Sequence, residues 1–288
     1  MNSDFFLTPP RLFLRIIRMK ISKTLIFLFF GLALLTSTLE AKTLFDGYYR
    51  IDLNDKHVGY MVIEYRYDEK TKTFTHLSFL TTTTPSGKTQ ESLKAQSNEK
   101  LEPLSYSYTA QVGEDLKTID AQFKGQIMKV KITDGKTKAQ NLTFKNPKGS
   151  FLSSFLTYLM LQKGISIGTK FTYKGIAEED GNNYNGEAWV KEKTEYNSIP
   201  SYKILNKFKG DEFVSFISEK GEILGTFVPN HKLTAQLVST PPEATKGMMV
   251  PHKTLELLFG KVPLGRTNHF IQKPVDKKAK SEPKKESK

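Results

Sequence analysis

Few side chains of this 288-residue chain could do chemistry, and none stands at the spacing of a known catalytic or metal site. The five histidines lie far apart, and none has a carboxylate or second histidine at a metal-ligand spacing such as HExxH. Ser150 lies in the stretch PKGSFL, which lacks the GxSxG pattern of a serine nucleophile. The absence of cysteine excludes thiolate metal sites, cysteine nucleophiles and disulfides. We therefore predict no catalytic residue, no metal site, no cofactor and a protein that is not an enzyme.

The stretch Glu178-Glu179-Asp180, with Asn182 and Asn183, offers oxygen ligands of the kind that calcium binds. This stretch lacks the spacing of a recognised calcium loop, so we interpret it as the acidic tip of a hairpin. The net charge is +13, but no stacking platform or known nucleic-acid motif accompanies it. We therefore expect no nucleic-acid partner.

The first 41 residues have the organisation of a secretory signal peptide. Two lysines precede the uncharged run Thr24–Leu35, and Ala41 closes a polar segment that suits signal peptidase. The run is too short for a ~30 Å hydrocarbon core, which needs about 20 residues. We predict an exported, periplasmic protein whose translation starts at Met19. An uncleaved, membrane-anchoring signal remains the alternative, because Leu39 is not a small residue.

The other end of the chain is basic and nearly free of apolar residues. The segment Lys273–Lys288 holds seven lysines against three acidic residues. Such a composition predicts a disordered tail, over 266–288. The tail is either a solvated end or a tether to an anionic surface or envelope protein. A single β-rich domain is expected between the leader and the tail, over 42–265.

Period-two alternation dominates that domain. Leu104, Tyr106, Tyr108 and Ala110 alternate with polar residues, and similar patterns follow at 117–123 and 128–132. Because successive side chains of a strand point to opposite faces, these are strands with one buried and one wet face. Turn residues punctuate the pattern, for instance at Asn54-Asp55, Asp134-Gly135 and Asp180-Gly181. The fold class is therefore mainly β: a curved antiparallel sheet of about a dozen strands.

One segment breaks the alternation. Ser150–Lys163 carries apolar residues at helical spacing, with Ser150 as N-cap and Gly164 beyond the end. Its wide apolar stripe predicts burial on the concave face of the sheet. Strand aromatics are either ordinary core or the lining of an apolar cavity under this helix. The candidates for lining a ligand cavity are Phe151, Phe155, Leu156, Leu159, Tyr106, Tyr108 and Trp189.

This organisation resembles a known architecture. The first hairpin carries Asp46-Gly47-Tyr48-Tyr49 and Val58-Gly59-Tyr60, and Gly164 and Gly168 lead from the helix into Phe171-Thr172-Tyr173. With the apolar helix, these stretches resemble the half-barrels of the bacterial lipoprotein-carrier (LolA-like) superfamily, and more narrowly the periplasmic domain of unknown function family 3108. The resemblance implies a half-barrel that carries lipid or acylated protein in its concavity, and it transfers no catalytic residue.

The leading hypothesis is a non-enzymatic envelope protein that binds a lipid or other apolar ligand between sheet and helix. The alternative is a structural or scaffold protein that binds another envelope component through a sheet face or edge. A hydrolase whose titratable groups converge only in the folded chain is the third hypothesis.

Overall fold

The computed structural model describes residues 41–265, apart from 86 and 136. The predicted leader up to residue 40 and the predicted tail from residue 266 therefore lie outside the described residues. Strands dominate the described part, and they are β1 Lys42–Leu53, β2 Lys56–Asp68, β3 Thr73–Thr84, β4 Gly87–Asn98, β5 Pro103–Val112, β6 Asp115–Lys124, β7 Ile127–Asp134, β8 Gln140–Lys145, β9 Phe151–Leu152, β10 Lys170–Ala177, β11 Asn182–Tyr196, β12 Ile199–Phe208, β13 Asp211–Ser218, β14 Ile223–Val228 and β15 Leu233–Leu237.

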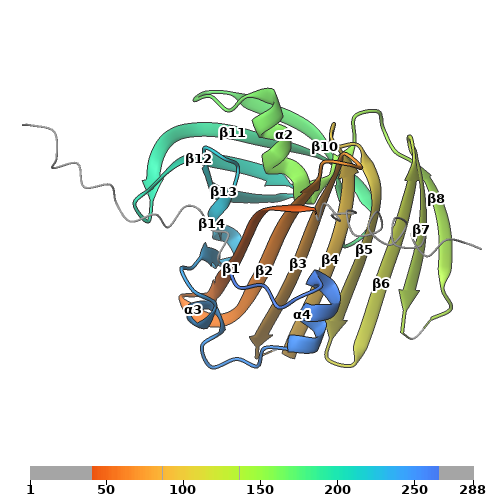
Figure 1. Ribbon diagram of the computed structural model, residues 1–288, viewed down its shortest axis with the longest axis horizontal. Helices are drawn as coiled ribbons and strands as arrows, with labels where there is room; N and C mark the ends of the chain where they lie inside the picture. The colour runs from red at the N-terminus through yellow and green to blue at the C-terminus, as the bar shows by residue number, and fades with distance from the viewer. Residues whose placement is uncertain (1–40, 86, 136, 266–288) are drawn as a thin grey trace, which may run out of the picture. The chain divides into compact units, whose positions relative to one another are not determined.

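All 15 strands belong to one sheet, in the order β8-β7-β6-β5-β4-β3-β2-β1-β15-β14-β13-β12-β11-β10-β9 (Figure 1). Every neighbouring pair is antiparallel except β9 and β10, which run parallel. The mainly β, curved antiparallel fold predicted from the sequence is confirmed, with 15 strands in place of about a dozen.

The connection between β8 and β9 shows how strongly this sheet must curve. A flat sheet of this size would measure about 65 Å across, at ~4.8 Å per strand step. The two edge strands are nevertheless consecutive in the chain, and only residues 146–150 join them. Such a link reaches about 20 Å at most. The sheet therefore bends until its edges approach each other, and we call the gap between them the seam.

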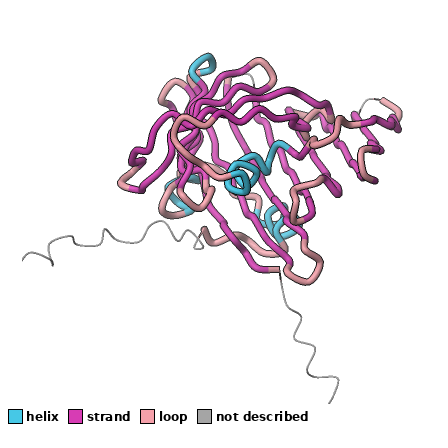
Figure 2. The backbone as a smooth tube through the Cα atoms, turned by 90° about the horizontal axis from the view of Figure 1, so that it is seen from above, coloured by secondary structure: helices cyan, strands magenta, loops and turns pink. Residues whose placement is uncertain are grey.

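The predicted helix is present but shorter than expected. Phe151–Leu152 forms β9, Ser153–Phe155 forms the 3₁₀ turn η1, and only Leu156–Lys163 is α-helical, as α2. The Ser150 hydroxyl does not cap the helix, because it donates to the carbonyl of Pro147 at 2.8 Å. Parallel neighbours require a long crossover, usually helical, and η1 and α2 supply it between β9 and β10. Figure 2 shows α2 inside the curve of the sheet.

The inner face of the sheet and α2 enclose the larger core. Its fully buried members include Tyr49, Ile119, Met128, Phe155 and Met160. On the strands predicted from alternation, the inner side chains are the apolar ones: Tyr106 and Tyr108 of β5 are buried, whereas Ser107 between them is exposed.

A second core lies on the outer face of β1–β3, where the sequence predicted a wet surface. The segment after β15, with α3 Pro241–Thr245 and α4 His252–Phe259, folds back over these strands (Figure 1). It buries Tyr60, Val62 and the Glu64 carboxylate completely. Both faces of β2 are thus covered. The sequence did not predict this, because alternation shows which side chains share a face but not what packs against that face.

Candidate functional site

A pocket of about 440 Å³ opens at the seam, between the β4–β5 turn, residues 148–151, α2 and β10. We call it the seam pocket. Its volume lies in the range of small-molecule sites. Gln162 of α2 donates to the carbonyl of Glu99 at 2.9 Å and so ties the helix to the β4–β5 turn beside the pocket. The lining residues are Lys100, Leu101, Glu102, Lys148, Gly149, Ser150, Phe151, Leu159, Lys163, Thr172, Tyr173 and Lys174.

Four apolar or aromatic side chains line the seam pocket. Leu101, Phe151 and Tyr173 are buried in the main core, and Leu159 of α2 is half-buried beside them. The rings of Phe151 and Tyr173 meet edge to face, with centroids 5.6 Å apart. Core packing fixes Leu101, Phe151 and Tyr173 in place, and Leu159 presents most of the apolar surface that a ligand could reach.

Leu101 adopts a backbone conformation that is unusual for a branched residue, with φ of 60°. This left-handed geometry costs about 1–2 kcal/mol for an L-residue. The turn imposes it, because the Asn98 side-chain oxygen accepts from the backbone N–H groups of Lys100 and Glu102 at 3.0 and 2.9 Å. Backbone strain of this kind concentrates at functional sites. It places the Leu101 side chain in the wall of the seam pocket.

The rim of the pocket is basic. It carries four exposed lysines, from four different segments, and one carboxylate, Glu102. Glu102 Oε2 accepts from Asn98 Nδ2 at 2.7 Å within its own turn. The four lysines are Lys100, Lys148, Lys163 and Lys174.

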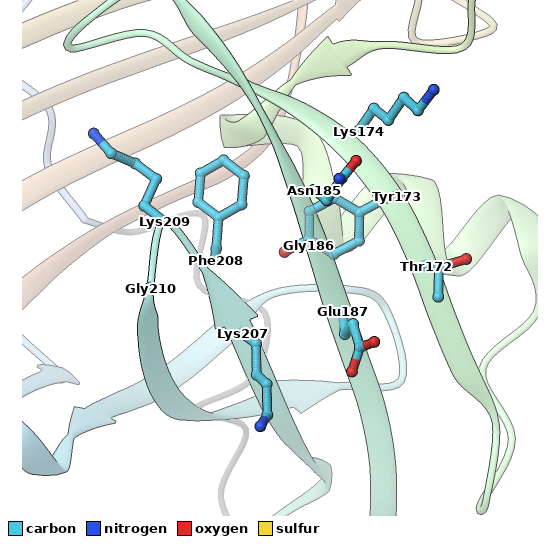
Figure 3. A pocket seen from close by; sticks show the side chains of 10 residues that line it. All are labelled: Thr172, Tyr173, Lys174, Asn185, Gly186, Glu187, Lys207, Phe208, Lys209 and Gly210. Carbon is cyan, nitrogen blue, oxygen red and sulfur yellow. The ribbon is translucent and has the colours of Figure 1, made fainter.

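Two further hollows adjoin the seam pocket. One, of about 340 Å³, shares Glu102, Lys148, Gly149 and Ser150 with it and extends toward Phe123 and Asn146. The other, of about 430 Å³, shares Thr172, Tyr173 and Lys174 and runs over β10–β12. Figure 3 shows that second hollow, with Tyr173 and Phe208 coming from the strands on the two sides of Gly186. Their ring centroids are 5.9 Å apart. The three hollows thus share lining residues around the seam pocket.

The centre of the curve, by contrast, is filled by aromatic side chains. Tyr65 lies 4.6 Å from the His76 ring and 5.0 Å from the Tyr158 ring, between centroids, and Phe155 packs against both Tyr65 and His76. Burial lowers the pKa of His76 to about 3, so this imidazole is neutral. The Tyr65 hydroxyl donates to the Ser154 carbonyl at 2.7 Å.

A buried carboxyl group anchors the start of the crossover. Glu178 accepts from the Ser153 hydroxyl at 2.6 Å and from the Ser154 backbone N–H at 3.1 Å. Burial raises the pKa of Glu178, and these hydrogen bonds oppose that rise only in part. The acidic stretch predicted as a hairpin tip forms the β10–β11 turn, where Lys209 pairs with both Glu179 and Asp180 at 2.6 Å. The carboxylates of Glu179 and Asp180 thus form ion pairs that link this turn to Lys209.

The structure brings only some of the predicted cavity residues together. Phe151 and Leu159 line the seam pocket. Phe155 is wholly buried in the filled centre, and Leu156 is half-buried against the same core. Tyr106 is buried with its ring 6.2 Å from Phe123, which lines the adjoining hollow.

The other two predicted residues lie apart from the seam pocket. Tyr108 is buried in the β5 part of the core, where its hydroxyl bonds the Glu91 carboxylate and burial raises its pKa. Trp189 is 37% exposed on the outer face of β11, where the Lys191 ammonium lies 3.0 Å from its ring centroid.

Sequence reasoning missed Leu101, Tyr173 and the lysine rim. Tyr173 stands in the stretch Phe171-Thr172-Tyr173, but nothing local marks it as facing a seam. Leu101 lies in Asn98–Glu102, where the polar residues Asn98 and Glu99 signal a turn. No local signal links the lysines, because Lys174 lies 74 positions after Lys100 in the chain.

No three histidine or acidic side chains come together as a metal site within the part of the chain that the structure describes. Within the same part, no helix has the length and apolarity needed to cross a bilayer.

Fold and site together define a class: a barrel-like, open β-sheet protein with a pocket where its edges approach. A solved structure shares this fold, the "Beta-barrel-like Protein of Domain of Unknown Function DUF1849 from Brucella abortus". The match has a TM-score of 0.51 at 12% identity and covers 67% of this chain and 95% of that one. A DUF1089 family protein from Pseudomonas aeruginosa gives a TM-score of 0.34 at 9% identity, over 64% of this chain and 90% of that one.

No protein-family model and no curated protein matches the sequence. The similarity to the Brucella protein shows the fold alone. The narrower resemblance to lipoprotein carriers stays a prediction.

Proposed function

We propose that this protein is a non-enzymatic binding protein of the bacterial envelope that takes an acyl-chain-like apolar ligand into the seam pocket. The observation that carries the proposal is the pocket itself: a hollow of about 440 Å³ walled by Leu101, Phe151, Leu159 and Tyr173. Export is part of the proposal and rests on the leader sequence.

The proposed site differs from the one expected from the sequence. The space between sheet and α2 holds the packed rings of Tyr65, Phe155 and Tyr158, and we therefore place the ligand at the seam pocket instead. The ligand enters from solvent at the seam, beside the outer end of α2. Burial of its chain against the pocket wall supplies the driving force, at roughly 25 cal/mol per Å² of apolar surface.

Two leucines of α2 test this location. Leu159 and Leu156 are both half-buried on the same helix, but only Leu159 lines the pocket. Leu159→Trp should fill the pocket and lower the affinity for a fluorescent fatty-acid probe at least tenfold. Leu156→Trp is the matched control and should leave probe affinity near that of the parent. Equal losses in both variants, at unchanged circular dichroism, would place the ligand elsewhere, as would no loss in Leu159→Trp.

Lipid extraction from protein expressed as the full chain supplies an independent readout. Mass spectrometry should find acyl compounds in the parent and less of them in Leu159→Trp. Parent protein that yields no acyl compound and binds no probe would overturn the proposed function.

A scaffold role has one specific observation in its favour, the free edge of the sheet at β8. Among the described residues β8 pairs only with β7, it contains no proline, and its register with β7 has no bulge. Such an edge can accept an added strand from a partner. Thr143→Pro should abolish capture of an envelope protein by this route while leaving probe binding intact.

A further inference from the structure

Four lysines gather at the rim of the seam pocket, and like most lysines among the described residues they form no ion pair. Among the described residues, none of Lys100, Lys148, Lys163 and Lys174 is within 4.0 Å of a carboxylate oxygen. The lysines that do pair with acidic residues lie on β10–β12 and in the turn after β12: Lys170, Lys193, Lys203, Lys207 and Lys209. What distinguishes the rim is its composition: four lysines stand against one carboxylate, Glu102, which makes a local excess of positive charge.

The lysines meet only because the sheet curls. Lys100 lies in the β4–β5 turn, Lys148 in the link across the seam, Lys163 at the end of α2 and Lys174 on β10. Their ammonium groups sit on long, flexible stems, so they can follow a head group at the mouth of the pocket. Only Glu102 opposes them within the lining, and it is engaged by Asn98.

We propose that the ligand of the seam pocket is an anionic amphiphile, with its chain on the apolar wall and a carboxylate or phosphate head at the lysine rim. This inference rests on the proposed function and names its ligand class. An ammonium group is a point charge that binds either anion. An uncharged head would gain nothing from the four positive charges, and a cationic head would be repelled by them.

Ligands with one sixteen-carbon chain and different heads test the head-group preference. Palmitate and hexadecyl phosphate compete with the fluorescent probe, and hexadecanol, the uncharged control, supplies the reference affinity. We expect both anions to bind at least tenfold more tightly than the alcohol at low salt, a difference of about 1.4 kcal/mol. The preference should shrink as ionic strength rises, because exposed charges are screened. The ratio between the two anions separates a carboxylate ligand from a phosphate ligand.

A quadruple variant identifies the lysines. Replacement of Lys100, Lys148, Lys163 and Lys174 by Gln should bring the anions to the affinity of the alcohol while leaving alcohol binding unchanged. The matched control replaces Lys170, Lys191, Lys193 and Lys203 by Gln, which removes the same charge from β10 to β12 at positions that line neither hollow, and it should keep the preference. Equal binding of anion and alcohol by the parent overturns this inference alone, as does a preference that survives in the rim variant. Absence of all binding overturns the proposed function as well.

Discussion

His76 should make the folded protein sensitive to acid. Its imidazole is 4% exposed, packs against Tyr65 and Phe155, and has no partner for Nδ1 among the described residues. Burial lowers the pKa of His76 to about 3, whereas an unfolded histidine titrates near 6.5. Below pH 6.5 the His76 imidazole therefore binds a proton in the unfolded state but not in the native state. The contribution of His76 to the free energy of unfolding is fully present above pH 6.5 and is lost as the pH falls from 6.5 toward 3.

The size of the effect follows from that gap. Each pH unit within the window is worth about 1.4 kcal/mol, so from pH 6.5 to pH 4 His76 alone removes about 3 kcal/mol of unfolding free energy. That is a large share of the 5–15 kcal/mol typical of a domain. His76→Phe keeps a ring in the same place and removes the titration. Any packing change in the variant is the same at every pH and cancels from the comparison.

Urea unfolding followed by circular dichroism at pH 7, 5.5 and 4 measures the effect. We expect the stability of His76→Phe relative to the parent to improve by about 3 kcal/mol between pH 7 and pH 4. His252→Gln is the control, because that histidine is exposed on α4, and its curve should parallel that of the parent. Parallel curves for His76→Phe and the parent would refute the reasoning, since they would show that the buried imidazole accepts a proton without cost.

Three further substitutions test the energetics of the fold. Burial raises the pKa of Glu178, so the native state holds a proton more tightly than the unfolded state. The free energy of unfolding therefore falls as the pH rises from the carboxyl pKa of the unfolded state toward that of the native state. Glu178→Gln should therefore gain stability on the parent between pH 4 and 8 in chemical unfolding, and a constant difference would contradict this. Arg66→Met should cost about 3 kcal/mol, because it leaves the buried Glu64 carboxylate without its bidentate partner; Glu64→Gln in the same chain should restore part of the loss. Gly186→Ala should cost about 1–3 kcal/mol in thermal unfolding, because its Cβ would lie 2.3 Å from the Tyr173 ring; an unchanged melting temperature would show that the ring moves away freely.

The turns of the sheet and the inward side of its strands could be predicted from the sequence. Asn54-Asp55 forms the β1–β2 turn with positive φ at both residues, as a tight hairpin requires. Asn197-Ser198 does the same between β11 and β12, with φ of 51° and 63°, although no glycine marks it. Alternation likewise placed Ile119 and Val130 on the inner face, where both are buried. These features depend on neighbours in the chain, so residue types suffice to predict them.

The segment that packs on the outer face of the sheet could not be predicted in the same way. The residues Tyr60, Val62 and Glu64 look like the outward half of an alternating strand, yet all three are fully buried beneath the segment that carries α3 and α4. That segment lies about 190 residues further along the chain, where Ala244 and Phe259 meet β2 through their carbonyl oxygens. Contacts over such a separation leave no periodic signal at either end.

The helix shows a conflict between local pattern and tertiary demand. Phe151 and Leu152 fit the apolar stripe of a helix that starts at Ser150, but the edge of β10 offers unpaired backbone groups to any neighbouring strand. Phe151 pairs with Gly175 and Leu152 with Ile176, so these two residues extend the sheet instead. The pairing turns the Phe151 ring toward Tyr173 and thereby builds one wall of the seam pocket.

The seam pocket could not be inferred from the sequence because no single element contains it. Lys100, Lys148 and Lys174 each read as one more solvated lysine beside a turn or on a wet strand face. They acquire a common role only when the five-residue link between β8 and β9 forces the sheet edges together. That link is also the part of the site least able to change, since a longer connection would let the edges separate. The specificity of the pocket is therefore set by topology, and the apolar residues that sequence reasoning favoured supply only its wall.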